Sequence, residues 1–132
     1  MNRIFKVLIV DDEPIITKLI GMVLPKSKYS PIFAFNGTDA IRKTLTEKPD
    51  LIILDLCMPD IDGMEVLQIL KNNSDTRLIP VIICSAIQKI SAVEKSFNSG
   101  AVHYLFKPLD YNKVCKKADA ILKISQNNRK AA

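Results

Sequence analysis

The chain has no tryptophan, one histidine and only four glycines among its 132 residues. With so few glycines it contains no glycine-rich phosphate loop, which argues against nucleotide and flavin binding. The single histidine, His103, falls in a predicted strand, whereas a histidine that donates a phosphoryl group is expected on an exposed helix. We therefore assign His103 no special role.

Long apolar runs are also missing from the sequence. A membrane-spanning helix needs about 20 consecutive apolar residues, and no stretch of the chain approaches this length. Residues 1–3 lead directly into a strand pattern rather than a signal peptide. We therefore expect no membrane contact and a cytoplasmic location.

Cysteine is scarce, and Cys57, Cys84 and Cys115 lie far apart in the sequence. No histidine or second cysteine lies at a zinc-ligand interval from any of them. We expect all three to be reduced, mostly buried and unreactive. Cys57 follows Asp55 by two residues, and the surrounding carboxylates are expected to raise the pKa of its thiol.

Composition and charge describe one ordinary globular domain. Apolar residues make up 48% of the chain and charged residues 25%, which is close to the average, and a chain of this length forms a single domain over residues 1–132. The net charge of +5 comes entirely from residues 107–132, which hold seven basic and two acidic residues. No arginine cluster or interleaved aromatic residues accompany these lysines. We therefore interpret them as a solvated face and expect no direct binding of nucleic acid.

Five short apolar runs predict five β-strands, at residues 5–10, 30–35, 51–54, 80–84 and 102–106. Helical spacing of apolar residues predicts a helix after each strand, at residues 14–24, 38–48, 63–71, 91–99 and 110–125. Thr38 is the expected cap of the second helix, and Ser91 with Glu94 forms a capping box for the fourth. This alternation indicates the α/β class, a doubly wound (βα)5 fold with a parallel sheet and helices on both faces.

The third predicted strand ends abruptly at Asp55, and turn residues follow it. Pro59 restricts the backbone, Asp60 and Asp62 favour local turns, and Gly63 allows a backbone shape that other residues resist. We expect this loop to hold Asp55 in place.

Polar side chains follow four of the five predicted strands. Asp11 and Asp12 follow the first strand, Asp55 the third, Ser85 the fourth and Lys107 the fifth. Because parallel strands end at the same edge of a sheet, these side chains are expected to converge on one pocket.

The chemistry of such a pocket is phosphoryl transfer. Three carboxylates held together repel one another, so a cation is needed, and carboxylates without histidine or thiolate ligands suit Mg²⁺. An aspartate beside Mg²⁺ can attack a phosphoryl group and form an acyl phosphate. Lys107 and Ser85 offer an ammonium and a hydroxyl to the phosphoryl oxygens.

Four motifs resemble those of the receiver domains of two-component response regulators. They are Val-Asp-Asp-Glu-Pro at residues 10–14, Asp55 with Met-Pro at 58–59 and Asp-Gly at 62–63, Ser-Ala at 85–86, and Tyr104 with Lys-Pro at 107–108. The resemblance covers residues 4–125 and implies a flavodoxin-like strand order, 2-1-3-4-5. Residues 126–132 lose the helical pattern and are expected to fray or to begin a linker.

The resemblance implies a role for each acidic residue of the pocket. Asp55 would accept a phosphoryl group from a sensor histidine kinase or a phosphotransfer protein. Mg²⁺ would be bound directly by Asp12, Asp55 and the backbone carbonyl of Cys57, and through a water molecule by Asp11. Such a domain is a signalling switch rather than an enzyme, and it catalyses only its own phosphorylation and dephosphorylation.

The resemblance also implies a switch. Ser85 would move toward the phosphoryl group, the ring of Tyr104 would turn inward behind it, and the peptide bond between Lys107 and Pro108 would be cis. A downstream protein or output domain would bind the face formed by the fourth helix, fifth strand and fifth helix, and a phosphorylation-linked homodimer is left open. The lifetime of the phosphorylated state is also open, because it depends on variable positions beside the site.

Two alternative functions compete with the phosphorylated switch. A haloacid-dehalogenase-like phosphatase also forms an aspartyl phosphate, but it places a second aspartate two residues after the nucleophile, where this chain has Cys57. Its usual cap domain also has no room in 132 residues. A receiver-shaped scaffold that is never phosphorylated would need neither Asp55 nor Lys107, so we favour the phosphorylated switch.

Overall fold

A computed structural model describes residues 3–131 of the chain, with side chains described for residues 3–123. Strands and helices alternate as predicted, and β2, β4 and β5 begin within one residue of the predicted positions. The elements are β1 (Phe5–Val10), α1 (Pro14–Val23), β2 (Tyr29–Ala34), α2 (Gly37–Glu47), β3 (Leu51–Leu54), α3 (Gly63–Lys71), β4 (Val81–Ser85), α4 (Ile90–Asn98), β5 (His103–Phe106) and α5 (Tyr111–Ala131).

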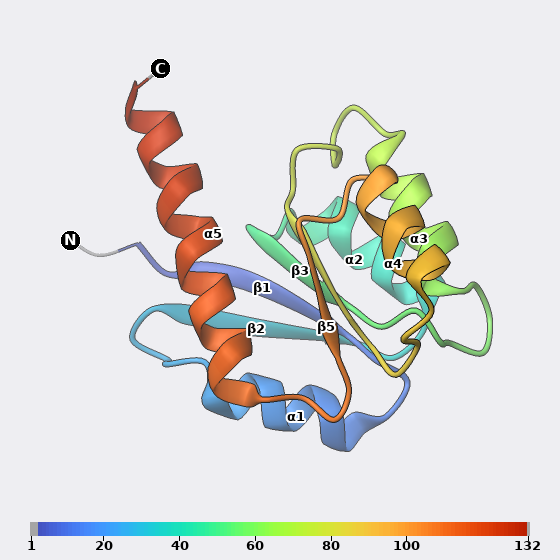
Figure 1. Ribbon diagram of the computed structural model, residues 1–132. Helices are drawn as coiled ribbons and strands as arrows, with labels where there is room; N and C mark the ends of the chain where they lie inside the picture. Colours follow the sequence, from blue (N-terminus) through green and yellow to red (C-terminus); the bar gives the residue numbers. More distant parts are fainter. Residues whose placement is uncertain (1–2, 132) are drawn as a thin grey trace.

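The strands form one parallel sheet in the order β2-β1-β3-β4-β5. Helices α1 and α5 lie on one face of the sheet, and α2, α3 and α4 lie on the other (Figure 1). This doubly wound α/β arrangement confirms the predicted fold class and strand order. Because all strands run in the same direction, their carboxyl ends share one edge of the sheet.

The central strands are buried on both faces, and successive residues alternate between two apolar clusters. Val7 and Ile53 belong to the cluster under α1 and α5, while Leu8 and Ile52 belong to the cluster that includes residues of α2 and α3. All four are at most 1% exposed. Two-sided burial explains why these strands are continuous apolar runs, and it holds the strand ends that carry the polar residues.

Two predicted helix starts are wrong. Asn36 rather than Thr38 caps α2, because its side chain accepts a hydrogen bond from the backbone N–H of Asp39 at 2.8 Å. Ser91 does not open a capping box, because α4 begins one residue before it and the N-cap residue, Lys89, makes no side-chain cap bond. The first turn of α4 therefore lacks the side-chain cap that the sequence suggested.

The last helix, α5, continues to Ala131 and includes most of the segment that we expected to fray. Ala132 lies outside the described residues, and the expectation of a frayed tail or linker over residues 126–132 stays a prediction. None of the helices in the described part of the chain is both long and apolar enough to cross a membrane.

Candidate functional site

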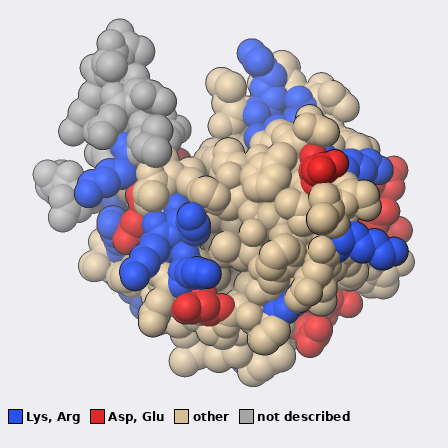
Figure 2. Space-filling model, in the orientation of Figure 1, with Lys and Arg blue, Asp and Glu red and all other residues tan. Residues whose placement is uncertain are grey.

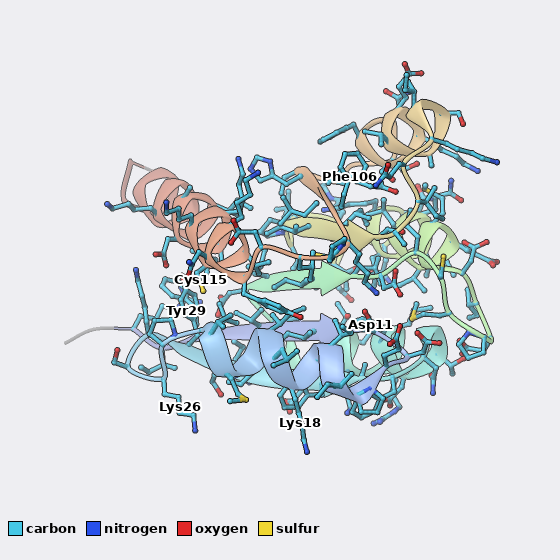
Figure 3. All side chains as sticks on the ribbon, turned by 60° about the horizontal axis from the view of Figure 1, so that its bottom comes forward. Asp11, Lys18, Lys26, Tyr29, Phe106 and Cys115 are labelled. Carbon is cyan, nitrogen blue, oxygen red and sulfur yellow. The ribbon has the colours of Figure 1, made fainter. Side chains whose placement is uncertain are left out.

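The carboxyl ends of β1 and β3 bring three aspartates together. Asp55 and Asp11 are buried, with 4% and 2% of their surface exposed, whereas Asp12 is exposed. The strand pairing continues past β3, since the backbone N–H of Asp55 donates to the Val10 carbonyl at 3.0 Å. One carboxylate oxygen of each aspartate lies within 4.8 Å of the others. The predicted carboxylate cluster is therefore present, and Figure 3 shows Asp11 at the arrowhead ends of the strands.

Lys107 comes into this cluster from the end of β5. Its ammonium lies 2.7 Å from Asp11 Oδ2 and 3.3 Å from Asp55 Oδ2, and its side chain is 16% exposed. Burial alone would lower the pKa of Lys107, but the hydrogen bond to Asp11 and the charges of Asp55 and Asp11 raise it overall. Lys107 is thus a charged partner shared by two buried carboxylates. The peptide bond that joins it to Pro108 is cis.

The surroundings of Asp55 oppose its negative charge. Burial and the neighbouring charge of Asp11 raise the pKa of Asp55, while Lys107 and the backbone N–H of Cys57 act in the opposite direction. The cluster offers carboxylate oxygens and no histidine or thiolate, which is the donor set of a hard divalent cation. The three aspartates therefore fit a metal site, and a cation there would offset the repulsion at Asp55.

Ser85 and Tyr104 are linked to each other through Ile87, which lies in the loop between β4 and α4. Ser85 is fully buried, and its Oγ accepts a hydrogen bond from the backbone N–H of Ile87 at 3.2 Å. The hydroxyl of half-buried Tyr104 donates to the carbonyl of the same Ile87 at 2.6 Å. Ser85 is also joined to the lysine of the site, because the N–H of Lys107 donates to the Ser85 carbonyl at 2.9 Å.

Cys57 differs from the expectation that the cysteines are mostly buried. It is exposed, while Cys84 is buried and Cys115 is half-buried. Asp55 and Leu56, which follow β3, are still buried, and the chain reaches the surface only at Cys57. Partial burial and the charge of Asp55 raise the pKa of the Cys57 thiol, which agrees with the predicted direction. Its backbone carbonyl stays a predicted metal ligand.

The loop from Asp55 to Gly63 is fixed at its far end in a way that the sequence did not reveal. The Asp60 carboxylate accepts hydrogen bonds from the backbone N–H of Gly37 at 2.8 Å and of Thr38 at 2.9 Å, at the start of α2. These bonds lower the pKa of Asp60 strongly. The sequence predicted only a turn here, because the two partners are far apart along the chain. Asp60 therefore ties the loop to α2.

Gly63 is required by space rather than by backbone conformation. A Cβ atom at this position would lie 2.1 Å from the Asp55 carbonyl oxygen and 2.6 Å from Leu56 Cα. Its backbone N–H also donates to the Leu56 carbonyl at 2.8 Å. The loop therefore folds back onto the backbone of Asp55 and Leu56, directly after β3, which only glycine permits. This corrects the predicted reason for a glycine while it supports the predicted role of the loop.

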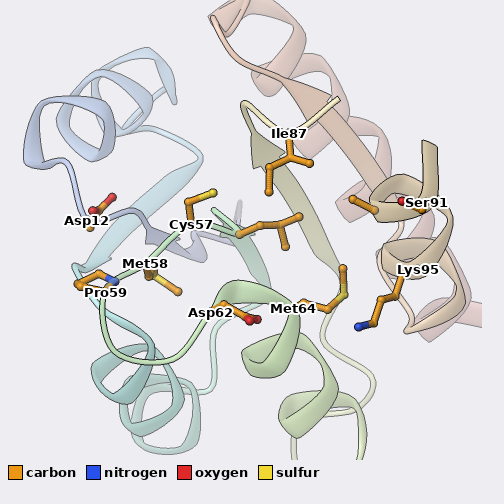
Figure 4. Close-up of a pocket in the computed structure, with 11 residues that line it drawn as sticks. Asp12, Cys57, Met58, Pro59, Asp62, Met64, Ile87, Ser91 and Lys95 are labelled. Atoms are coloured by element: carbon orange, nitrogen blue, oxygen red, sulfur yellow. The ribbon is translucent and has the colours of Figure 1, made fainter. Parts of the chain in front are cut away.

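An apolar groove of about 700 Å³ opens beside the carboxylate cluster, between the loop after β3 and α4 (Figure 4). Asp12 and Cys57 stand at its end next to the aspartates, and Ile87 and Lys95 stand on the far wall. The sequence did not predict the groove, because three separate segments form it. Its lining is Asp12, Leu56, Cys57, Met58, Pro59, Asp62, Met64, Ile87, Ser91, Ala92 and Lys95.

A five-stranded doubly wound sheet with three aspartates and a lysine at its carboxyl edge defines a phosphoryl-accepting type of α/β domain. The profile of the response regulator receiver domain matches residues 7–119. The chain therefore belongs to the response regulator receiver domain family and is the receiver domain of a two-component response regulator, as the sequence motifs predicted.

Individual relatives agree with this assignment. The chain is 34% identical to the DNA-binding dual master transcriptional regulator RpaA of Synechocystis over 96% of its own length and 53% of that protein. It is 35% identical to the chemotaxis protein CheY of Treponema pallidum, over 90% of this chain and 83% of CheY. The chain thus spans about half the length of the first curated relatives it matches.

A solved structure of similar shape is the CheX-CheY-BeF3-Mg²⁺ complex from Borrelia burgdorferi. The matching chain is 29% identical, with a TM-score of 0.83 over 89% of each chain. The fold of the described residues therefore agrees with that of a solved relative in the same family.

Proposed function

We propose that Asp55 is the phosphoacceptor of this receiver domain. The observation that carries the proposal is the position of Lys107, whose ammonium contacts the buried carboxylates of both Asp55 and Asp11. An oxygen of Asp55 attacks the phosphorus of a donor phosphohistidine, the phosphorus–nitrogen bond breaks, and the electron pair leaves with the imidazole. A carboxylate nucleophile needs no general base. Lys107 then binds a phosphoryl oxygen as a point charge.

The proposed cofactor is Mg²⁺, held by Asp12, Asp55 and the backbone carbonyl of Cys57, with Asp11 acting through a water molecule. When bound, Mg²⁺ neutralises part of the charge that gathers on the phosphoryl oxygens. Exposed Asp12 gives the ion an open approach, whereas buried Asp11 is already hydrogen-bonded to Lys107. The donor set of carboxylate oxygens supports this choice of ion.

The proposed switch consists of Ser85, Ile87 and Tyr104. If the Ser85 hydroxyl turns to donate to a phosphoryl oxygen, its Oγ leaves the backbone N–H of Ile87. Ile87 then loses one of its two hydrogen bonds and is free to move. The Tyr104 ring, whose hydroxyl donates to the Ile87 carbonyl, can follow Ile87 inward. These two hydrogen bonds support a mechanical connection between phosphorylation and the exposed end of β5.

The proposed partners follow from the family. A sensor histidine kinase or phosphotransfer protein would supply the phosphoryl group, and the domain would catalyse only its own phosphorylation and dephosphorylation. A downstream protein or output domain would bind the exposed surface of α4, β5 and α5, which we call the output face; a phosphorylation-linked homodimer is the other use of this face. We propose a single receiver domain with a core at residues 4–125, working in the cytoplasm.

The test is to incubate the protein with Mg²⁺ and acetyl phosphate and to measure the intact mass. We expect a mass gain of one phosphoryl group that is lost on treatment with base. The adduct should be absent from Asp55→Asn, and it should form slowly in Asp12→Asn because the ion is held more weakly. An adduct of equal yield in Asp55→Asn would move the phosphoacceptor to another residue.

Lys107→Ala separates the chemistry from the switch. We expect the adduct to form in this variant, while the change at Tyr104 on phosphorylation, followed by NMR of its ring, becomes weak. A full change at Tyr104 in Lys107→Ala would contradict the role given to the ammonium.

A further inference from the structure

The loop between β3 and α3 has few hydrogen bonds to the rest of the molecule. Residues 57–61 form its outer part, and among the described residues only Asp60 joins this part to another element by hydrogen bonds. The N–H of Cys57 donates to Asp55 Oδ1 at 3.4 Å, which stays within the loop. Met58 and Ile61 pack against the core. The position of the outer loop therefore depends on Asp60 and on these apolar contacts.

The Asp60 carboxylate binds the start of α2 with both of its oxygens. Oδ1 accepts from the N–H of Gly37 at 2.8 Å, while Oδ2 accepts from the N–H of Thr38 at 2.9 Å and from the Thr38 hydroxyl at 2.8 Å. Because the two oxygens have different donors, these bonds fix both the position and the rotation of the carboxylate. The free N–H groups at a helix start carry partial positive charge, which favours a carboxylate there.

The backbones of α2 and the loop are also in close contact. A Cβ atom on buried Gly37 would lie 2.9 Å from the carbonyl oxygen of Ile61 and 2.9 Å from Ile61 Cβ. The loop is thus packed against α2 at Ile61 and hydrogen-bonded to it at Asp60. A shift of the loop away from α2 would break both contacts.

The charges at this edge of the sheet oppose the closed position of the loop. The loop carries Asp60 and Asp62 and follows Asp55, and the carboxylates of Asp11 and Asp12 lie at the same edge. In the space-filling view, acidic side chains lie along the side of the molecule that carries the loop, at the right (Figure 2). Like charges repel, so the donors at the start of α2 offset a force that would move the loop outward.

Asp60 differs in position from the other carboxylates of this region. Among the described residues, the group that could hold a metal ion is Asp11, Asp12 and Asp55, and both oxygens of Asp60 are bonded to α2. Asp62 caps α3 instead, since it accepts from the N–H of Glu65 at 2.9 Å. Asp60 can therefore act on the metal site only through the backbone of the loop.

We propose that Asp60 is a positioning residue for the metal site: by holding the outer loop against α2, it sets the position of the Cys57 carbonyl and so the affinity of the domain for Mg²⁺. Cys57 precedes Asp60 by three residues in the same loop. The inference rests on the proposed function, which makes that carbonyl a ligand of Mg²⁺. It gives a role to a carboxylate that the sequence predicted only as a turn residue.

The test is Asp60→Ala, with Mg²⁺ titrated calorimetrically into the metal-free protein. We expect the dissociation constant of Mg²⁺ to rise roughly tenfold, as is usual when a group that orients a metal ligand is removed. Adduct formation from acetyl phosphate should slow at low Mg²⁺ and return to within about twofold of the unaltered rate at saturating Mg²⁺. Faster amide exchange at Gly37 and Thr38, followed by NMR, reports that the contact with α2 is lost.

Two control variants separate this contact from the loss of charge. Asp60→Asn removes the same charge but keeps one oxygen that can accept from a backbone N–H of α2, so the dissociation constant should stay within about threefold of the unaltered protein. Asp39→Ala removes the same charge from the first turn of α2, where the carboxylate pairs with Arg42 and Lys43. It should change the dissociation constant by less than about twofold.

A second variant displaces the loop while it keeps the charge of Asp60. The new methyl group of Gly37→Ala would press on Ile61 and move the loop away from α2. We expect Mg²⁺ to bind at least about threefold more weakly to this variant. Circular dichroism and urea unfolding check that each variant is folded under the conditions of the titration.

Several outcomes would overturn the inference. They are an unchanged dissociation constant of Mg²⁺ in Asp60→Ala or in folded Gly37→Ala, an equal loss in Asp39→Ala, equal effects of Asp60→Ala and Asp60→Asn, or a slow rate in Asp60→Ala that saturating Mg²⁺ does not restore. An unaltered chain that binds no Mg²⁺ and forms no adduct contradicts the proposed function and the inference with it. Normal Mg²⁺ binding and a normal adduct in Asp60→Ala contradict the inference alone.

Discussion

Asp55 is a carboxylate whose surroundings raise its pKa and so make its ionised form costly. It is 4% exposed, burial and Asp11 raise its pKa, and Lys107 compensates only in part. A group whose pKa is raised in the folded state stabilises the fold below its unfolded pKa, and this contribution is lost as the pH rises through the folded pKa. Ionised Asp55 is therefore a cost to stability at neutral pH, and the same cost favours metal binding.

Asp55→Asn should consequently stabilise the metal-free protein at pH 7. We expect the free energy of unfolding to rise by on the order of 1 kcal/mol, because a buried charge with an incomplete partner is removed. The gain should shrink below about pH 4, where the aspartate is protonated in both states. Urea unfolding in EDTA, at pH 7 and at a pH below about 4, measures this gain in the free energy of unfolding. Asp12→Asn, at an exposed position, should change stability by less than about 0.5 kcal/mol, and an equal gain there would contradict the explanation.

Gly63→Ala should be strongly destabilising, because the new methyl group would overlap the backbone of Asp55 and Leu56, directly after β3. We expect a loss of about 3 kcal/mol in urea unfolding, at the upper end of the usual range for overpacking. Gly21→Ala is the control, since its Cβ would meet side-chain atoms, the Phe33 ring at 3.0 Å and Pro31 Cβ at 3.7 Å, and the Phe33 side chain can move. A milder loss in Gly63→Ala than in Gly21→Ala would show that the loop adapts.

At the scale of elements, α5 is held against β2 by a polar contact at the edge of the core. The hydroxyl of buried Tyr29 donates to the Asp119 carboxylate, and Lys28 lies 3.1 Å from the same oxygen. Burial alone would raise the pKa of Asp119, but the hydrogen bonds from Tyr29 and Lys28 lower it overall. A group with a lowered folded pKa stabilises above its unfolded pKa, and this contribution is lost as the pH falls through the folded pKa.

Tyr29→Phe should cost about 1 kcal/mol at pH 7, the usual net value of one hydrogen bond. The difference from the unaltered protein should become smaller as the pH falls from about 4, the unfolded pKa of an aspartate, through the lower folded pKa of Asp119. Urea unfolding between pH 3 and pH 7 measures this difference in the free energy of unfolding. Tyr111→Phe is the control, since the described residues give the Tyr111 hydroxyl no hydrogen bond. A pH-independent loss in Tyr29→Phe would mean that only packing was lost.

Sequence reasoning predicted the elements and the convergence of Asp11, Asp55 and Lys107, because apolar runs and a parallel sheet determine where strands end. It did not predict contacts whose partners are distant along the chain. The bonds from the start of α2 to Asp60, the bridge through Ile87 and the apolar groove all depend on the packing of loops. Local capping patterns at Thr38 and Ser91 also failed, since a helix start depends on how the preceding loop leaves the strand.

At the scale of the molecule, the two apolar clusters share the central strands and stabilise one sheet from both faces. Ile52 and Ile53 are neighbours in β3, yet each belongs to a different cluster. The two apolar clusters therefore meet at β3. Loss of either cluster should unfold the whole domain rather than one side of it.

Ile52→Ala and Ile53→Ala should each cost about 2–5 kcal/mol, the range for buried aliphatic truncations. The double variant should be largely unfolded at 25 °C, because the total stability of such a domain is about 5–15 kcal/mol. Circular dichroism and urea unfolding measure both. A double variant that keeps half of its helical signal in a separate, later transition would contradict a single cooperative unit.

The bridge through Ile87 has a consequence for the unstimulated protein. One loop residue accepts from Tyr104 and donates to Ser85, so the resting arrangement is favoured by two net hydrogen bonds, together about 1–3 kcal/mol. A gap of this size leaves roughly one to fifteen per cent of unphosphorylated molecules in the other arrangement. We expect relaxation-dispersion NMR to detect millisecond exchange at residues 85–89 without any phosphoryl donor. Absence of exchange at these residues would mean that unphosphorylated molecules do not populate the second arrangement.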